Sequence, residues 1–323
     1  MAKQRLVEFD ILRGLLIIAV VMGHAGVKTP WVDMQWFRMP AFFMVSGYFM
    51  RELCCDGSML RRRARRLLVP YVAWSVVMWC LLHPEPLWKN VLRTVYGGGF
   101  NITVYSFPWW FVNALMTSLI AFSFLRKAKS GGVILFVVIC YALAHVQVIW
   151  RALPANLPWG IDEALGAIPF LWIGHMLRGR LQPRTGVPFG AGRWALALGG
   201  TLVVCAGFCA LDTLLGWGYR LNMKSVIYTH WLLDLLVPLS FSYLVYLLSL
   251  LLARVPGVRS VLGYVGVACM TVFYVHACVL HVLRPLVGVW GAIVLAVVLG
   301  VALHALWSRW HWSRVVFLGE VSK

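Results

Sequence analysis

Residues 9–27 read FDILRGLLIIAVVMGHAGV, an apolar run long enough to cross a bilayer that also holds polar, titratable side chains. A bilayer core requires about 20 apolar residues per helix. Asp10, Arg13 and His24 interrupt the run, and a charged residue at the middle of a membrane helix costs about 2.5–3.5 kcal/mol. Such residues usually face a cavity or a partner, so this stretch predicts a membrane helix with one functional face.

The composition indicates the same class of protein. Of the 323 residues, 61% are hydrophobic and 12% are charged, and the mean hydropathy is +0.81. Soluble domains carry about 25% charged residues, so a soluble globular domain is excluded. The net charge of +18 would suggest nucleic acid in a soluble protein. In a membrane protein the basic residues belong to loops whose sidedness sets topology, and no nucleic-acid partner is expected.

Ten apolar stretches of this kind follow one another along the chain. The sequence therefore predicts an all-α bundle of about ten transmembrane helices that forms a single domain over residues 1–323. The predicted spans are residues 9–27, 35–50, 67–83, 107–124, 132–149, 163–178, 193–212, 229–252, 261–282 and 286–308. The long connection at 84–106 contains GGGFN and is predicted to be an exposed loop or a re-entrant segment.

The distribution of basic residues predicts the orientation of the bundle. If the N-terminus is cytoplasmic, the inner segments hold 20 of the 29 Lys and Arg residues and the outer segments hold 8, with Arg13 inside the first span. Cytoplasmic loops of membrane proteins carry the excess of basic residues. Both termini are therefore predicted to be cytoplasmic, which requires an even number of spans.

The spacing within the first span gives its polar face an inner and an outer end. Arg13 and His24 are eleven residues apart, which places them on one helical stripe about 16 Å apart along the axis. Asp10 precedes Arg13 by three residues, close enough to form an ion pair. The alternative interpretation is that these residues only anchor the helix at the interface and pack against its neighbours.

Two further stretches, in the second span and before the third span, carry recognisable signals. In the second span, Ser46 and Gly47 favour close packing of a neighbouring helix. Before the third span, residues 61–66 read RRRARR. This basic run either sets topology and binds lipid headgroups, or it binds a polyanion from the cytoplasm, because guanidinium groups suit phosphates.

Aromatic and acidic residues open two later spans on the predicted outer side. Trp109, Trp110 and Asn113 begin the fourth span, where they form an aromatic belt or a platform for a sugar ring. Asp162 and Glu163 begin the sixth span, where they complement the helix dipole or bind hydroxyl groups. The residues alone leave both alternatives open.

Neither a metal site nor a disulfide framework is expected. The eight Cys residues contain no CxxC pair, and most lie in apolar runs, where Cys behaves as a small hydrophobe. His276 and His281 are five residues apart in the ninth predicted span, which places them on different helix faces. The HExxH pattern of zinc enzymes is also missing.

In order along the chain, five stretches resemble the acyltransferase 3 family of membrane acyltransferases. The resemblance is strongest to its compact sugar O-acetyltransferase branch, the fucose 4-O-acetylase-like proteins, and it extends over nearly the whole chain. The family pattern of an Arg, ten intervening residues and a His is matched by Arg13 and His24. The five stretches are FDILRGLLIIAVVMGH (9–24), MPAFFMVSGYF (39–49), RRRARRLLVPYVAW (61–74), PWWFVNAL (108–115) and LGYVGVACMTVFYVH (262–276).

The resemblance implies transfer of an acyl group, usually acetyl, from cytoplasmic acyl-CoA to a hydroxyl. The acceptor it implies is a lipid-linked or exported glycan, in a bacterial inner membrane. Membrane lipids are the other expected partners. The main alternative is a transporter or flippase of a polar or anionic substrate, because polar residues on one stripe of a bundle also suit translocation.

Specific residues take roles under this hypothesis. His24 is the expected general base, since a neutral imidazole suits proton transfer near pH 7. Arg13 would hold negative charge and Asp10 would orient Arg13. Acyl-CoA phosphates are expected to bind Arg62, Arg63, Arg65 and Arg66. The expected contacts to the acceptor are Trp109, Trp110, Asn113, Glu163 and His276.

Overall fold

The computed structural model describes residues 6–82, 86–100, 103, 105–106, 108–150, 156–178 and 191–320. Within these residues the chain forms a helical bundle with one short antiparallel hairpin. The elements are α1 (Val7–His24), α2 (Gln35–Phe49), α3 (Gly57–Leu82), α4 (Leu87–Tyr96), η1 (Gly98–Phe100), α5 (Trp110–Phe124), α6 (Ser130–Trp150), η2 (Pro158–Gly160), α7 (Ile161–Leu177), α8 (Ala191–Leu215), β1 (Leu221–Asn222), β2 (Ile227–Tyr228), α9 (Leu233–Leu252), α10 (Pro256–Val267), α11 (Cys269–Trp307) and α12 (His311–Leu318).

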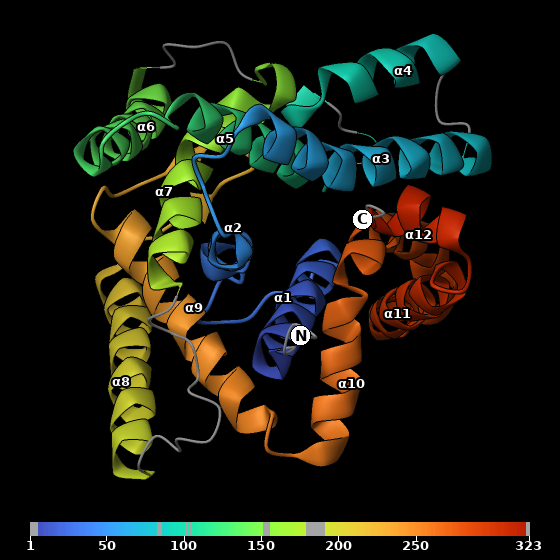
Figure 1. Ribbon diagram of the computed structural model, residues 1–323. Coiled ribbons are helices and arrows are strands. Elements are labelled where there is room, and N and C mark those ends of the chain that lie inside the picture. Colours follow the sequence, from blue (N-terminus) through green and yellow to red (C-terminus); the bar gives the residue numbers. More distant parts are fainter. Residues whose placement is uncertain are drawn as a thin grey trace.

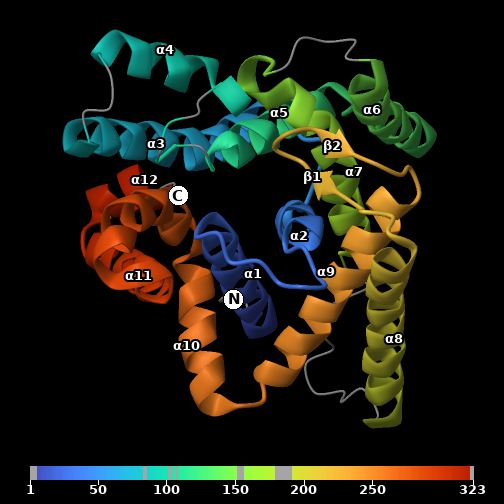
Figure 2. The same ribbon diagram turned by 180° about the vertical axis from the view of Figure 1, so that it is seen from behind.

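Helices α1 and α2 lie at the centre of the bundle, enclosed by the others (Figure 1). α1 packs against α9, α10 and α11, while α2 packs against α7 and α9. Seen from behind, the β1–β2 hairpin lies close to α2 and α7 (Figure 2). Its strands contact α2 and α6. The helix that carries the polar stripe is therefore surrounded by protein, as the cost of its polar residues in lipid requires.

Glycines let the central helices approach closely. A side chain at Gly266 of α10 would overlap the carbonyl oxygen of Asp10 in α1, and one at Gly14 would overlap the carbonyl oxygen of Leu262. Small residues at such positions allow backbones to pack directly. Helix α10 is thereby held against the polar half of α1.

Several helices have the dimensions of membrane spans. Among the residues that the structure describes, five helices are long and apolar enough to cross a membrane, and the shorter α5 is also apolar. The prediction of an all-α membrane protein is confirmed, while the ten crossings and the cytoplasmic termini stay predictions. The five helical stretches are Gly57–Leu82, Ser130–Val148, Gly192–Leu215, Leu233–Leu252 and Cys269–Trp307.

The third helix begins ten residues before the predicted span at 67–83. Asp56 precedes α3 and accepts hydrogen bonds from the Met59 backbone N–H and the Ser58 hydroxyl, both at 2.8 Å. These two bonds hold the pKa of Asp56 below its ordinary value, with the Met59 bond the larger cause. Because this cap starts the helix early, the basic run at 61–66 is helical and not a loop.

The ninth predicted span, 261–282, is interrupted. α10 ends at Val267 and α11 begins at Cys269, with Ala268 between them. α11 itself turns at Gly288, whose φ of 72° is left-handed, and Gly300 then packs against Val272. The last two predicted spans are therefore a helical hairpin preceded by a separate helix.

The predicted loop at 84–106 is helical in part. Helix α4 occupies Leu87–Tyr96, with Trp88 and Val95 exposed while Asn90 and Thr94 are buried. A helix with apolar side chains facing outward and polar ones inward suits a position against lipid. Residues 84–85, 101–102 and 104 of that prediction lie outside the described residues.

Candidate active site

His24, the last residue of α1, faces a second histidine from α11. The His24 Nδ1 and His276 Nε2 atoms are 2.7 Å apart, within hydrogen-bonding distance. The two rings are nearly parallel, with centroids 5.0 Å apart and an interplanar angle of 10°. Close packing of α1 on α10 and α11 brings together residues separated by 252 positions.

The surroundings of His276 determine which nitrogen of each ring carries hydrogen. His276 Nδ1 lies 3.1 Å from the Val272 carbonyl oxygen and 2.8 Å from that of Phe273. A carbonyl oxygen only accepts, so Nδ1 carries the hydrogen. His276 is fully buried, which favours the neutral ring, and its Nε2 therefore accepts from His24 Nδ1–H. In neutral His24 the lone pair is then on Nε2, as a general base requires.

The His24 end of α1 opens into a polar cavity of about 240 Å³. Its walls come from α1, α2, α5, α11 and the β1–β2 hairpin. Trp110 lies in the wall, whereas His276 is not among the lining residues. The polar residues that line the cavity are His24, Gln35, Arg38, Asn222, Lys224 and Ser225.

Arg38 is the charged residue most deeply built into this cavity. Its side chain is 7% exposed, and Nη1 donates to the backbone carbonyl oxygens of Ala19 at 3.1 Å and Val20 at 3.4 Å. These carbonyls belong to the last turns of α1, where a cation is favoured by the helix dipole. A side chain at Gly23 would collide with the guanidinium, so Arg38 lies directly beside the His24 turn.

The predicted ion pair at the other end of α1 is present. Arg13 Nη1 lies 3.4 Å from Asp10 Oδ1. The Arg13 guanidinium also lies over the Phe49 ring at 4.5 Å from its centroid, a cation–π arrangement. Arg13 is not among the residues that line the His24 cavity, so the cavity does not extend along the whole stripe.

The basic run forms one exposed face near the start of α3. Arg62, Arg65 and Arg66 are exposed. Arg63 is partly buried and is used locally: it donates to the Glu52 carbonyl oxygen and lies 3.4 Å from the Cys55 sulfur. Three of the four arginines predicted to bind phosphates thus present their guanidinium groups outward.

The remaining predicted contacts to the acceptor divide between two places. Trp110 lines the cavity, but Trp109 is 1% exposed. Trp109 packs edge-on against Tyr71, Tyr105 and Tyr274, in the interior of the bundle.

Asn113 and Glu163 lie beneath the glycine turn at 97–99. Asn113 Oδ1 accepts from the Gly98 backbone N–H at 3.2 Å. A side chain at Gly160 would collide with a Glu163 carboxylate oxygen. Both residues are 1% exposed, and neither is among the lining residues of the His24 cavity.

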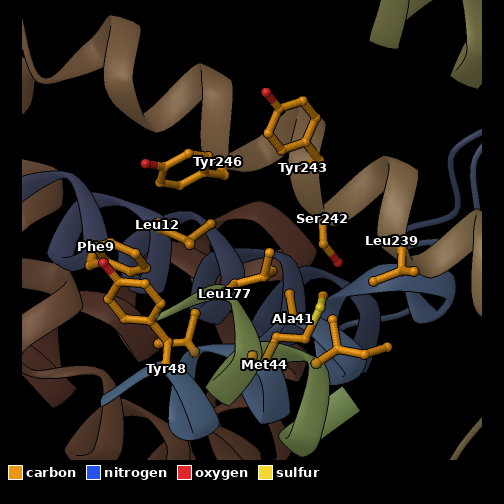
Figure 3. Close-up of a pocket in the computed structure, with 13 residues that line it drawn as sticks. Phe9, Leu12, Ala41, Met44, Tyr48, Leu177, Leu239, Ser242, Tyr243 and Tyr246 are labelled. Carbon is orange, nitrogen blue, oxygen red and sulfur yellow. The ribbon is translucent and has the colours of Figure 1, made fainter. Parts of the chain in front are cut away.

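A second cavity, of about 270 Å³, lies at the opposite end of α1 and is almost wholly apolar. Phe9 and Leu12 of α1 and Tyr48 at the end of α2 contribute to its walls. Figure 3 shows the Ser242 hydroxyl among these apolar side chains. The Tyr48 and Ser242 hydroxyls are buried and have no hydrogen-bond partner among the described residues. Such walls suit an apolar chain and not a charged headgroup.

Three features of the site were missed at the level of sequence. In the predicted topology Arg38 is only one of the eight basic residues on the outer side, although its position directly before Met39-Pro40 in an apolar run was a usable signal. Lys224 lies on a hairpin that no apolar pattern predicts. His145 and Asp234 hold that hairpin, with His145 Nε2 at 3.1 Å from Asp234 Oδ2, and their pairing across 89 residues leaves no local pattern.

Among the described residues, no group of three or more His, Cys, Asp or Glu side chains could hold a metal ion. The site therefore consists of an oriented histidine pair, a polar cavity and two cations. Such an arrangement can exchange a proton with a polar molecule bound in the cavity.

Comparison with known proteins gives the family. A family model described as an acyltransferase domain matches residues 6–316, nearly the whole chain. The chain therefore belongs to this acyltransferase 3 family, and the prediction of an acyltransferase is confirmed at the level of family.

Similarity to individual characterised sequences is local. Nodulation protein NolL of Mesorhizobium japonicum is 29% identical over 99 residues, which is 24% of this chain and 25% of that protein. NolL of Sinorhizobium fredii is 30% identical over 92 residues, with the same coverage of both chains. The match spans about a quarter of the length of these relatives. No solved structure matches this chain.

Proposed function

We propose that this protein is a membrane O-acyltransferase that moves an acyl group, usually acetyl, from cytoplasmic acyl-CoA to a hydroxyl of a lipid-linked or exported glycan. The observation that carries the proposal is the hydrogen bond between His24 and His276 at the polar cavity. In this proposal the protein belongs to the compact sugar O-acetyltransferase branch of the family and lies in a bacterial inner membrane. One domain over residues 1–323 crosses the membrane ten times with both termini cytoplasmic.

The chemistry follows from the orientation of His24. His24 Nε2 takes the proton from the acceptor hydroxyl as its oxygen attacks the carbonyl carbon of the thioester. The carbon–sulfur bond then breaks, and the CoA thiolate takes up the proton from the His24 imidazolium. The products are the acylated acceptor and CoA with a free thiol. No metal takes part in these proton transfers.

The donor reaches His24 from the end of α1 that carries the ion pair. The exposed guanidinium groups of Arg62, Arg65 and Arg66 attract the phosphates of acyl-CoA. The pantetheine arm passes Asp10 and Arg13, and it has roughly 16 Å of α1 to follow before its thioester meets His24. Arg13, oriented by Asp10 at 3.4 Å, holds negative charge of the donor on this path.

Transport is the competing function, and the orientation of the histidine pair argues against it. An imidazole held in one tautomer suits a single proton transfer at a fixed place.

The test of the proposal uses purified protein in detergent, where transport has no compartments to connect. Acetyl-CoA labelled in its acetyl group is supplied with glycan acceptors, and label on the acceptor is measured by mass spectrometry, since the protein's own thiols would disturb a colorimetric assay for CoA. We expect label transfer, and in the double variant Arg62→Gln/Arg65→Gln an increase in KM for acetyl-CoA of about 10-fold.

A matched control separates the donor site from general loss of basic charge. Arg259, exposed on α10, is changed to Gln and should leave KM for acetyl-CoA at its original value. Absence of any transfer, combined with uptake of a glycan by vesicles that contain the protein, would show a transporter instead. An unchanged KM in the double variant would move the donor phosphates away from α3.

A further inference from the structure

We infer that the acceptor is anionic, and that Arg38 and Lys224 bind a carboxylate or phosphate group next to the hydroxyl that receives the acyl group. This inference rests on the proposed function, because it assigns the substrate class of the same cavity. The two anions have the same recognition chemistry, namely charge-assisted hydrogen bonds from cations in a recess.

The first support is the burial of Arg38. At 7% exposure, a guanidinium is costly unless its charge is balanced. Nη1 is bonded to two carbonyl oxygens of α1, but buried Nε has no hydrogen-bond partner among the described residues. Asp33 is the acid whose charge acts on Arg38, and it does not line the cavity. A donor of Arg38 thus stays unsatisfied at the wall of a polar cavity.

The second support is Lys224, which approaches the same cavity from a different element. It lies in the turn between β1 and β2 and is partly buried. The hairpin is fixed from below, because the backbone N–H of His230 donates to Asp234 Oδ2 at 2.9 Å and Tyr228 packs against Gly166. These contacts hold the hairpin, and with it Lys224, at the wall of the His24 cavity.

The third support is the charge balance of the walls. Arg38 and Lys224 line the same cavity as His24, so both cations lie on the side of the bundle where His24 would act. Glu163 acts electrostatically on Lys224, but among the described residues no Asp or Glu side chain, Glu163 included, lines this cavity. A neutral hydroxyl needs no such excess of positive charge, whereas an anion offsets it. The volume of about 240 Å³ has room for one sugar ring, with Trp110 in the wall as an apolar face for it.

The experiment compares matched acceptors in the acetyl-transfer assay. The probes are 4-nitrophenyl glucoside, 4-nitrophenyl glucuronide and 4-nitrophenyl glucoside 6-phosphate, which share one ring and differ in charge at one carbon. We expect kcat/KM for an anionic probe to exceed that for the neutral probe by about 10- to 100-fold, as hydrogen bonds to charged groups imply. The probe with the larger ratio identifies carboxylate or phosphate as the natural group.

Variants then attribute the preference to the cavity. In Lys224→Met the ratio of anionic to neutral kcat/KM should fall towards one, and in Lys224→Arg it should be largely restored. Lys89→Met, a change at an exposed lysine on α4, should keep the original ratio. Equal use of neutral and anionic probes by the unmodified protein would overturn the inference. So would an equal fall for both probes in Lys224→Met, which would assign the cations to the transition state.

Direct binding separates failure of this inference from failure of the proposed function. If no probe is acetylated, binding of the same three compounds is measured by calorimetry on the detergent-solubilised protein. Tighter binding of an anionic probe, weakened in Lys224→Met, supports the anionic site even where acyl transfer is not observed. Binding that is equal for all three probes, or too weak to detect for all of them, contradicts it.

Discussion

His24 and His145 each stack on another aromatic ring, yet their hydrogen-bond partners give them different chemistry. His24 faces His276 at 2.7 Å, and its ring borders a polar cavity. His145 stacks on Trp231, with ring centroids 4.5 Å apart, and is 3% exposed. One ring can exchange a proton with a bound molecule and the other is enclosed.

Both ring nitrogens of His145 are engaged by protein atoms. Nδ1 lies 2.9 Å from the Tyr141 carbonyl oxygen and Nε2 lies 3.1 Å from the Asp234 carboxylate. The carbonyl oxygen can only accept, so Nδ1 carries a hydrogen, and Nε2 is engaged by the Asp234 carboxyl group. His24, whose partner is a neutral imidazole, keeps a lone pair on Nε2. The comparison teaches that the partner of a buried histidine, and not its burial, decides between a structural ion pair and a general base.

The largest expected effect comes from removing the base. His24→Gln should lower kcat for acetyl transfer by about 10²- to 10⁴-fold, the usual contribution of general acid–base catalysis. Its amide can still hydrogen-bond to His276, so the thermal unfolding midpoint should stay close to that of the unmodified protein. Turnover is measured with labelled acetyl-CoA. Full turnover by a correctly folded His24→Gln protein would show that His24 is not the general base. The contrast drawn here between His24 and His145 would then fail as well.

A smaller effect is expected from His276, which positions His24 and does not line the cavity. His276→Leu removes the acceptor for His24 Nδ1–H, so the ring is free to turn or to move its hydrogen to Nε2. We expect kcat to fall by about 10- to 100-fold, the size usual for a group that orients a functional histidine, with little change in KM for acetyl-CoA.

Restoration by a conservative variant distinguishes orientation from packing at this position. In His276→Gln an amide oxygen can accept from His24 Nδ1–H, so part of kcat should return. A Gln variant as inactive as the Leu variant, with equal thermal stability, would show that His276 does more than accept this hydrogen bond.

Local patterns in the sequence were sufficient for part of this picture. The spacing of three residues predicted the Asp10–Arg13 pair, and the apolar runs predicted the helices, because both depend on helical periodicity alone. The partner of His24 could not be obtained that way. His276 was expected to contact substrate, and only the packing of α11 on α1 places it behind His24.

The errors in the predicted helices have the same origin. The break at Ala268 leaves an apolar run uninterrupted in sequence, since it depends on how closely α10 approaches α1 through Gly266. Likewise, the hairpin with Lys224 is held by contacts between α6 and α9 that involve single residues far apart in the chain. Hydropathy reports on the lipid around a helix and carries little information about its protein neighbours.

The smallest effect on turnover is expected from a change at the buried pair of His145 and Asp234. The same change should clearly lower the stability of the protein. Asp234→Asn removes the carboxylate partner of His145 Nε2, and leaving a buried polar group without its partner costs about 1–3 kcal/mol. The thermal unfolding midpoint should fall, as measured with a thiol-reactive dye whose signal rises when the buried cysteines, Cys140 of α6 among them, become exposed. Below that midpoint, kcat with the neutral acceptor should change by less than about 3-fold, because the hydrogen bond between His24 and His276 does not depend on Asp234. A loss of kcat as large as that of His276→Leu, at unchanged stability, would mean that the two histidine sites act as one.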